Sequence, residues 1–196
     1  MNALVDILDR RLNAVGPVGS RTRGYALGAV ALLLHARPHD IGFLAIQRPA
    51  HMPQHGGQIS LPGGGVHEVD ESPSAAALRE TEEELGIPRP RIRLVGALGH
   101  FPIAVSRWDV LAYLGWWEGG HPLRPQKAEV EAVLDVALDD VAHQHRERFR
   151  GRTYTPLDYP EYFHRQEGRS YRIWGCTGRI LHHFLERIYL PRDAVS

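Results

Sequence analysis

Short apolar segments separated by turn-forming residues dominate the first part of the chain. Residues 26–35 form a largely apolar run between breakers, and residues 43–47 form a second run after the turn at residues 38–40. Apolar runs of this length predict buried strands, and the short turn between them predicts a hairpin. Further segments of this kind predict strands at residues 58–61, 92–98, 110–117 and 130–136.

Apolar residues at three- and four-residue spacing predict helices elsewhere in the chain. The clearest helix follows a sharp turn predicted at residues 62–65: Ser72 is a good N-cap, Pro73 suits the first helical position, and Gly86 ends the helix after residue 85. Strands and helices in this order predict an α/β fold in which helices cover both faces of a mixed sheet. Other helices are expected at residues 2–14, 138–148 and 174–190.

Composition narrows the classes of function. The 196 residues suit one domain, and the 23 basic and 23 acidic side chains cancel, so the chain lacks the basic field on which non-specific nucleic-acid binding depends. No apolar run approaches the roughly 20 residues that span a membrane, no secretion signal begins the chain, and Cys176 is the only cysteine. We therefore expect a cytoplasmic protein with a small-molecule substrate and neither a nucleic-acid nor a membrane partner. The sequence leaves the oligomeric state open.

The helix predicted to follow Ser72 is unusually acidic. Glutamates occupy positions 80, 82, 83 and 84. At about 100° per residue, Glu80, Glu83 and Glu84 share one face of a helix and Glu82 points away. The small residues at positions 76–77, one turn earlier, are expected to leave room for a ligand.

Three carboxylates on one helix face repel one another, and a divalent cation removes that conflict. Hard oxygen ligands favour Mg²⁺ or Mn²⁺, and Mg²⁺ in proteins often bridges to substrate phosphates. The pattern therefore predicts a metal site that works on a phosphate compound. The alternative is a solvated acidic face without a ligand.

In residues 65–87, a glutamate follows the first glycine by six residues, an Arg-Glu pair begins eight residues later, and a Glu-Glu pair and a second glycine come near the end. This segment resembles the signature box of the Nudix hydrolases. Thr81 is a departure, because the family has a bulky aliphatic residue there. The resemblance implies a Nudix-type α/β/α sandwich around a mixed β-sheet, and hydrolysis of a nucleoside diphosphate linked to another group. It also implies a single Nudix hydrolase domain over residues 1–196, with an N-terminal helical extension at residues 1–20 and a C-terminal helix at residues 173–190. The residues that match the box are Gly65, Glu71, Arg79, Glu80, Glu83, Glu84 and Gly86.

Within the box, we expect Glu80 and Glu84 to be the main metal ligands, because carboxylates at i and i+4 can chelate one ion. Glu83 is a candidate for a further ion or for the general base. The carbonyl of Gly65, freed by the turn, is expected to complete the coordination. The cofactor is therefore expected to be Mg²⁺ or Mn²⁺.

Two further side chains receive roles in catalysis. Arg79 is expected to orient Glu71 rather than to touch substrate, because an arginine beside several carboxylates tends to pair with one. Outside the box, Glu129 is a second candidate for the general base. A solvent-exposed carboxylate at the entry to a strand is the alternative for Glu129.

A pattern upstream of the box is similar to that of the coenzyme A diphosphatases within the Nudix superfamily. It comprises residues 44–48, Gly57 and residues 61–64, and residues 173–181 resemble a Trp-Gly-x-Thr helix start near the C-terminus of the same subfamily. The departures are Pro49, Leu61 and, above all, Pro53 in place of a second arginine. The resemblance implies that coenzyme A or a derivative is cleaved to 3′,5′-ADP and 4′-phosphopantetheine. The residues expected to contact substrate are Arg48, His55, Gly63 and Gly64.

Three other functions stay open. A Nudix enzyme with this box can act on ADP-ribose, a dinucleoside polyphosphate or an oxidised nucleotide, because fold and box alone do not fix the substrate. A non-catalytic Nudix-like binding module is a second possibility, although such modules usually lose glutamates of the box. A structural calcium site is a third, but the chain lacks an Asp-rich loop with alternating ligands.

Overall fold

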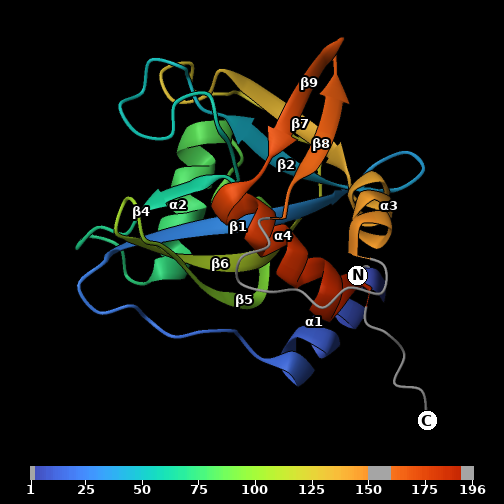
Figure 1. Cartoon of the computed structure of the whole chain (residues 1–196), viewed down its shortest axis with the longest axis horizontal. Helices are drawn as coiled ribbons and strands as arrows, with labels where there is room; N and C mark the ends of the chain where they lie inside the picture. The colour runs from blue at the N-terminus through green and yellow to red at the C-terminus, as the bar shows by residue number, and fades with distance from the viewer. Residues whose placement is uncertain (1–2, 150–159, 191–196) are drawn as a thin grey trace.

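The computed structural model describes residues 3–149 and 160–190, which form a mixed sheet between layers of helix (Figure 1). The strands run in the order β3-β2-β1-β6-β5, with β4 beside β1 and β7 beside β2. β1 is parallel to β6, and the other pairs in this sheet are antiparallel. Its strands are β1 (Ala26–Ala36), β2 (Ile41–Gln47), β3 (Ile59–Ser60), β4 (Gly63–Gly65), β5 (Ile92–Ile103), β6 (Trp108–Trp117) and β7 (Ala132–Ala137).

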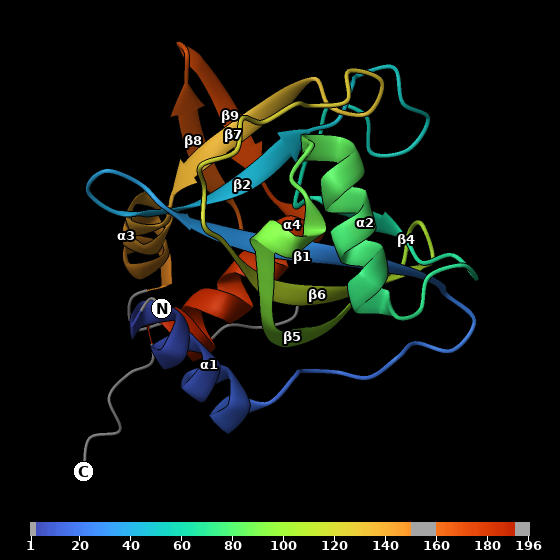
Figure 2. The ribbon, with the colours of Figure 1, turned by 180° about the vertical axis from the view of Figure 1, so that it is seen from behind.

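The helices divide between the two faces of the sheet (Figures 1 and 2). α2 covers one face and α1, α3 and α4 cover the other, which confirms the predicted α/β/α sandwich. A separate hairpin of β8 (Tyr162–Gln166) and β9 (Arg169–Ile173) lies beyond β7. The helical elements are α1 (Ala3–Val15), α2 (Pro73–Leu85), the 3-10 turn η1 (Arg89–Arg91), α3 (Leu138–Phe149), α4 (Gly175–Phe184) and the π-helical turn η2 (Leu185–Tyr189).

The central strand β1 shows why the sheet needs cover on both faces. Successive side chains of a strand point to opposite faces. Leu32 and Leu34 pack into the larger cluster with the side chains of α1 and α4, whereas Leu33 packs with Leu85 at the end of α2. Both faces of β1 are therefore dry, as its unbroken apolar sequence predicts.

α2 begins and ends at the capping residues that the sequence predicted. The side chain of Ser72 accepts a hydrogen bond from the backbone N–H of Ala75 at 3.1 Å. At the other end, Gly86 takes a left-handed conformation (φ 70°), and its N–H donates to the carbonyl of Glu82 at 2.8 Å. Thr81 is fully buried, and its hydroxyl donates to the carbonyl of Ala77 at 2.7 Å. This bond satisfies the polar group that stands in place of the family's aliphatic residue.

Several expectations about local structure were wrong. Residues 63–65 form strand β4 rather than a sharp turn, because their backbone pairs with residues 28–30 of β1. The strand predicted at residues 92–98 continues to Ile103. The β8–β9 hairpin was not predicted, and part of the region between α3 and that hairpin lies outside the described residues. Ala76 and Ala77 leave no room for a ligand, since both are fully buried against Ala29 on the sheet.

Within residues 3–149 and 160–190, no helix has the length and apolar character needed to cross a membrane.

Candidate functional site

Three glutamates from two distant parts of the chain meet beside the end of α2. Glu80 and Glu84 lie one turn apart on α2, and Glu129 lies in the loop that connects β6 to β7. A carboxylate oxygen from each lies within 4.8 Å of the other two. The structure thus brings Glu80 and Glu84 together as predicted, and it adds Glu129 to them rather than Glu83.

The loop that carries Glu129 is fixed by the last carbonyls of α2. The N–H of Gln126 donates to the carbonyl of Glu84 at 3.0 Å, and the N–H of Arg124 donates to that of Leu85 at 2.8 Å. The last carbonyls of a helix have no partner within the helix, so they are open to such bonds. The N–H of Glu129 then closes a turn on the carbonyl of Gln126 at 2.9 Å. The end of α2 therefore positions the third carboxylate as well as the first two.

Glu84 is the most perturbed of the three carboxylates. It is only 1% exposed, and one of its oxygens accepts a hydrogen bond from the backbone N–H of Gly63 at 2.9 Å. Burial raises the pKa of Glu84 to about 8; the nearby charges of Glu80 and Glu129 act in the same direction, and the Gly63 bond and Arg48 oppose it. A buried carboxyl crowded by two others is stabilised in its charged form by a cation.

The glycines of β4 allow the backbone to pass close to these carboxylates. A Cβ on Gly63, whose φ is 142°, would lie 2.3 Å from the carbonyl oxygen of Ala29. A Cβ on Gly64 would lie 2.5 Å from Cδ of Glu80. Any side chain at either position would displace β1 or a carboxylate of the cluster, so β4 needs glycine here.

Arg79 joins the acidic helix to the preceding loop, but not through the residue expected. Its guanidinium donates to both oxygens of Asp70, at 2.8 and 3.0 Å, and not to Glu71. It also donates to Glu80 at 2.8 Å and to Glu83 at 3.0 Å. The hydrogen bond from Arg79 is the main reason that the pKa of Asp70 lies well below its usual range. The box motif allows any residue at position 70, so no sequence signal pointed to this partner.

Besides Glu80, two other residues assigned to the metal are engaged with Arg79. The side chain of Glu83 is 53% exposed, and it lies outside the group formed by Glu80, Glu84 and Glu129. The carbonyl of Gly65 accepts from Arg79 at 3.1 Å. A direct role for either in metal binding stays a prediction. Glu82 points away from the cluster, as predicted, and pairs with Arg89 at 2.8 Å.

Arg48 lies at the end of β2, where its positive charge acts on Glu84. Its Nε is buried and has no hydrogen-bond partner among the described residues. The backbone of Arg48 also closes the following loop: its N–H donates to the carbonyl of Gln58, and its carbonyl accepts from Gly57, both at 3.0 Å. These bonds give a structural reason for the spacing between Arg48 and Gly57. In the same loop, the ring of His55 bonds to Gln58 at 3.1 Å.

The donor set suits a hard divalent cation. It consists of carboxylate oxygens, which suit Mg²⁺ and Mn²⁺ better than they suit Zn²⁺. The orphaned donor of Arg48 beside them suits a phosphate oxygen. The arrangement can therefore hold a metal ion and a phosphate group next to each other.

Comparison with known proteins agrees with this arrangement. A model of the NUDIX domain matches residues 24–157. The chain is 33% identical to the uncharacterized Nudix hydrolase NudL of Escherichia coli K12 over 172 residues, which cover 87% of this chain and 82% of NudL.

Solved structures share the fold. The Nudix hydrolase RenU of M. smegmatis superimposes with a TM-score of 0.51 at 21% identity, covering 70% of this chain and 93% of RenU. The NUDIX domain of Shewanella oneidensis NrtR, solved with ADP-ribose, has a TM-score of 0.50 at 24% identity, over 65% of this chain and 90% of that domain. With the domain match and the acidic site at the end of α2, these likenesses lead to one conclusion: the chain belongs to the Nudix family and is a hydrolase that acts on phosphoric anhydrides.

Proposed function

We propose that this Nudix hydrolase cleaves the diphosphate bond of coenzyme A or its thioesters, releasing 3′,5′-ADP and 4′-phosphopantetheine or its acyl form. The observation that carries the proposal is Arg48: its buried Nε has no hydrogen-bond partner within residues 3–149 and 160–190, and its charge acts on Glu84. The pattern of Arg48, Gly57 and residues 61–64 resembles that of the coenzyme A diphosphatases. We expect a cytoplasmic location, where this substrate is available.

In this proposal, Glu80, Glu84 and Glu129 hold Mg²⁺ or Mn²⁺. The chemistry that such an ion supplies is neutralisation of charge on phosphoryl oxygens and activation of a water molecule. Arg48 binds a phosphate oxygen and stabilises the negative charge that develops on it. Glycines 63 and 64 admit the diphosphate close to the backbone of β4.

The general base is assigned to Glu129. Glu83, the other candidate, is engaged in an ion pair with Arg79 at 3.0 Å. Glu129 is exposed and makes no side-chain hydrogen bond to another described residue. Its free oxygen can accept the proton of the attacking water. Arg79 acts by positioning Glu80 and the Asp70 loop.

A second candidate is hydrolysis of another nucleoside diphosphate derivative, such as ADP-ribose or a dinucleoside polyphosphate. Pro53 favours it, because a second arginine stands there in the coenzyme A pattern. The NUDIX domain of NrtR, which shares the fold, was solved with ADP-ribose.

The test incubates purified protein with coenzyme A, ADP-ribose or diadenosine tetraphosphate in Mg²⁺ or Mn²⁺, and separates the products by anion-exchange chromatography. Glu84→Gln removes a carboxylate of the cluster, and Glu82→Gln is the matched control on the outer face of the same helix. We expect metal-dependent release of 3′,5′-ADP from coenzyme A, lost in Glu84→Gln and kept in Glu82→Gln. Cleavage of only one of the other compounds would overturn the coenzyme A assignment and leave the hydrolase standing.

A further inference from the structure

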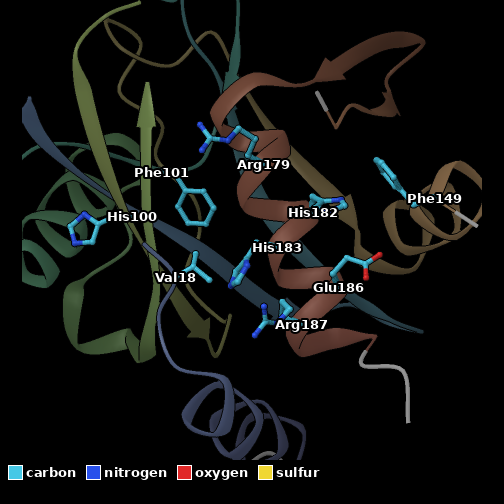
Figure 3. A pocket seen from close by; sticks show the side chains of 9 residues that line it. All are labelled: Val18, His100, Phe101, Phe149, Arg179, His182, His183, Glu186 and Arg187. Carbon is cyan, nitrogen blue, oxygen red and sulfur yellow. The ribbon is translucent and has the colours of Figure 1, made fainter. Parts of the chain in front are cut away.

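A hollow lined by both apolar and charged side chains lies on the opposite face of the sheet from α2. It has a volume of about 350 Å³ and lies along the outer side of α4 and η2 (Figure 3). Arg179, His183 and Arg187 follow one another along this helical segment and face Phe101 of β5 and Val18 (Figure 3). Their spacing of four residues places them on one stripe of the helix. The acidic cluster of α2 lies beyond the sheet and contributes nothing to this hollow.

The charged side chains that line this hollow, among the described residues, are two arginines and one glutamate. Arg187 is exposed and makes no hydrogen bond or ion pair with a described residue. Arg179 donates to the backbone carbonyl of Pro102 at 2.8 Å, and it forms no ion pair with a carboxylate in the described part of the chain. Glu186 is the carboxylate among the described lining residues, and it already lies 2.7 Å from Nε2 of His145. Among its described lining residues, the hollow therefore presents two arginines against one carboxylate, and positive charge predominates.

His183 lies between the two arginines, and both burial and positive charge favour its neutral form. Burial lowers the pKa of His183 to about 4, and the charge of Arg187 acts in the same direction. Its Nε2 is buried and has no hydrogen-bond partner among the described residues. His183 is thus neutral at physiological pH, and its ring reports any negative charge that enters the hollow.

The wall opposite the helix is held in place by the backbone. Val18 bridges to β5: its N–H donates to the carbonyl of Leu98 at 3.0 Å, and its carbonyl accepts from His100 at 2.8 Å. Gly99, with φ at 134°, permits this approach, since a Cβ there would lie 2.2 Å from the carbonyl oxygen of Val18. The ring of Phe101 lies 5.9 Å from the guanidinium carbon of Arg179 and fixes the position of that side chain. The hollow is therefore formed before any ligand arrives.

We propose that this hollow is a phosphate-binding site, separate from the catalytic site, in which Arg179 and Arg187 hold one phosphate group over His183. Eight residues of helix separate the two α-carbons by about 12 Å, which two arginine side chains can close around a single group. Guanidinium groups match phosphate oxygens in geometry and charge, and they remain charged at every physiological pH. The phosphate can be free phosphate or the phosphate of a nucleotide. The proposal does not depend on which diphosphate the enzyme cleaves.

The test follows the ring resonances of His183 by NMR in histidine-labelled protein. Inorganic phosphate and adenosine 5′-monophosphate are titrated separately in EDTA. We expect a saturable shift of the His183 resonances, because a bound dianion raises the affinity of that ring for protons. Tighter binding of the nucleotide would identify a nucleotide phosphate as the ligand, and equal binding would identify the phosphate group itself.

Three variants separate this site from others. Arg187→Glu changes an exposed residue, so the protein is expected to fold, and we expect phosphate to bind about tenfold more weakly or worse. Arg91→Glu, at an exposed arginine of η1, is the matched control and should bind as the parent does. Arg48→Gln weakens any binding at the catalytic site and should leave the His183 shift unchanged. A His183 resonance that ignores both ligands at millimolar concentration, or equal affinity in Arg187→Glu, would overturn the proposal.

Discussion

Replacing Glu84 by Gln is predicted to stabilise the metal-free protein while it abolishes catalysis. Glu84 is 1% exposed, and its pKa is raised from 4.5 to about 8, mainly by burial. Between these two values, the folded state holds a proton on Glu84 that the unfolded state has lost. Folding stability in EDTA therefore decreases as pH rises through this window, and it reaches a floor above pH 8.

The size of the effect follows from the two pKa values. The difference between the two pKa values lowers the free energy of unfolding of the metal-free protein by about 3 kcal/mol at pH 7 and by about 5 kcal/mol above pH 8. Gln is neutral and keeps a carbonyl oxygen for the N–H of Gly63, which bonds to Glu84 at 2.9 Å. Its amide N–H groups can donate to the carboxylates of Glu80 and Glu129. Gln therefore removes the electrostatic penalty without leaving a buried polar group unpaired.

Urea denaturation in EDTA at pH 5, 7 and 8 measures the free energy of unfolding of the parent and of Glu84→Gln. We expect Glu84→Gln to match the parent near pH 5 and to exceed it by about 3 kcal/mol at pH 7. Saturating Mg²⁺ should reverse the order, because ligand binding to the folded state stabilises the parent and the variant lacks the full site. Glu82→Gln, which alters only the exposed pair with Arg89, should show neither effect. A Glu84→Gln protein less stable than the parent at pH 8 in EDTA would refute the assigned charge state of Glu84.

Three further substitutions test the surroundings of the cluster. Gly64→Ala places a Cβ 2.5 Å from Cδ of Glu80, so kcat should fall about a hundredfold or more in steady-state assays; parent-like turnover would contradict the close approach. Arg79→Ala removes the hydrogen bonds to Asp70 and Glu80. A titration of activity against Mg²⁺ should then show that more Mg²⁺ is needed and that the maximum rate is lower. An unchanged titration curve would contradict a positioning role for Arg79. Thr81→Val removes the hydrogen bond from the Thr81 hydroxyl to the carbonyl of Ala77. Thermal unfolding should therefore show a change of about 1 kcal/mol in the free energy of unfolding, and turnover should not fall. A large loss of turnover would mean that the hydroxyl has a role beyond this hydrogen bond.

Local chemistry predicted α2 well. Ser72, Pro73 and Gly86 act on the backbone next to them, so their effect does not depend on the rest of the fold. Strand β4 was missed for the opposite reason. Its three glycines have little intrinsic preference for a strand, and only the pairing with residues 28–30 of β1 makes them extended.

The β8–β9 hairpin carried a weak signal that could have been used. Glu167 and Gly168 form its turn with φ of 52° and 75°. Two positive φ values in a two-residue turn are typical of hairpins, but Asn or Asp is the usual first residue and Glu is not. The sequence around this turn therefore lacks the usual hairpin motif, and the hairpin could not be recognised from it.

The site was predictable in so far as its residues lie on one helix. Helical spacing placed Glu80 beside Glu84, but it also placed Glu83 with them, because spacing does not show that Arg79 draws Glu83 away. Asp70 went unnoticed, since the box leaves its position open. Glu129 lies 45 residues beyond Glu84, and no local pattern shows that its loop docks on the end of α2.

We expect hydrolysis to depend on a metal site that Glu129 completes with Glu80 and Glu84. Electron paramagnetic resonance of free Mn²⁺ gives its dissociation constant in the parent and in Glu129→Gln, and turnover is measured over the same Mn²⁺ concentrations. We expect Glu129→Gln to weaken Mn²⁺ binding by about tenfold or more, and its turnover to stay far below that of the parent even at saturating Mn²⁺, because the general base is lost. Unchanged Mn²⁺ affinity together with unchanged turnover in Glu129→Gln would contradict this expectation.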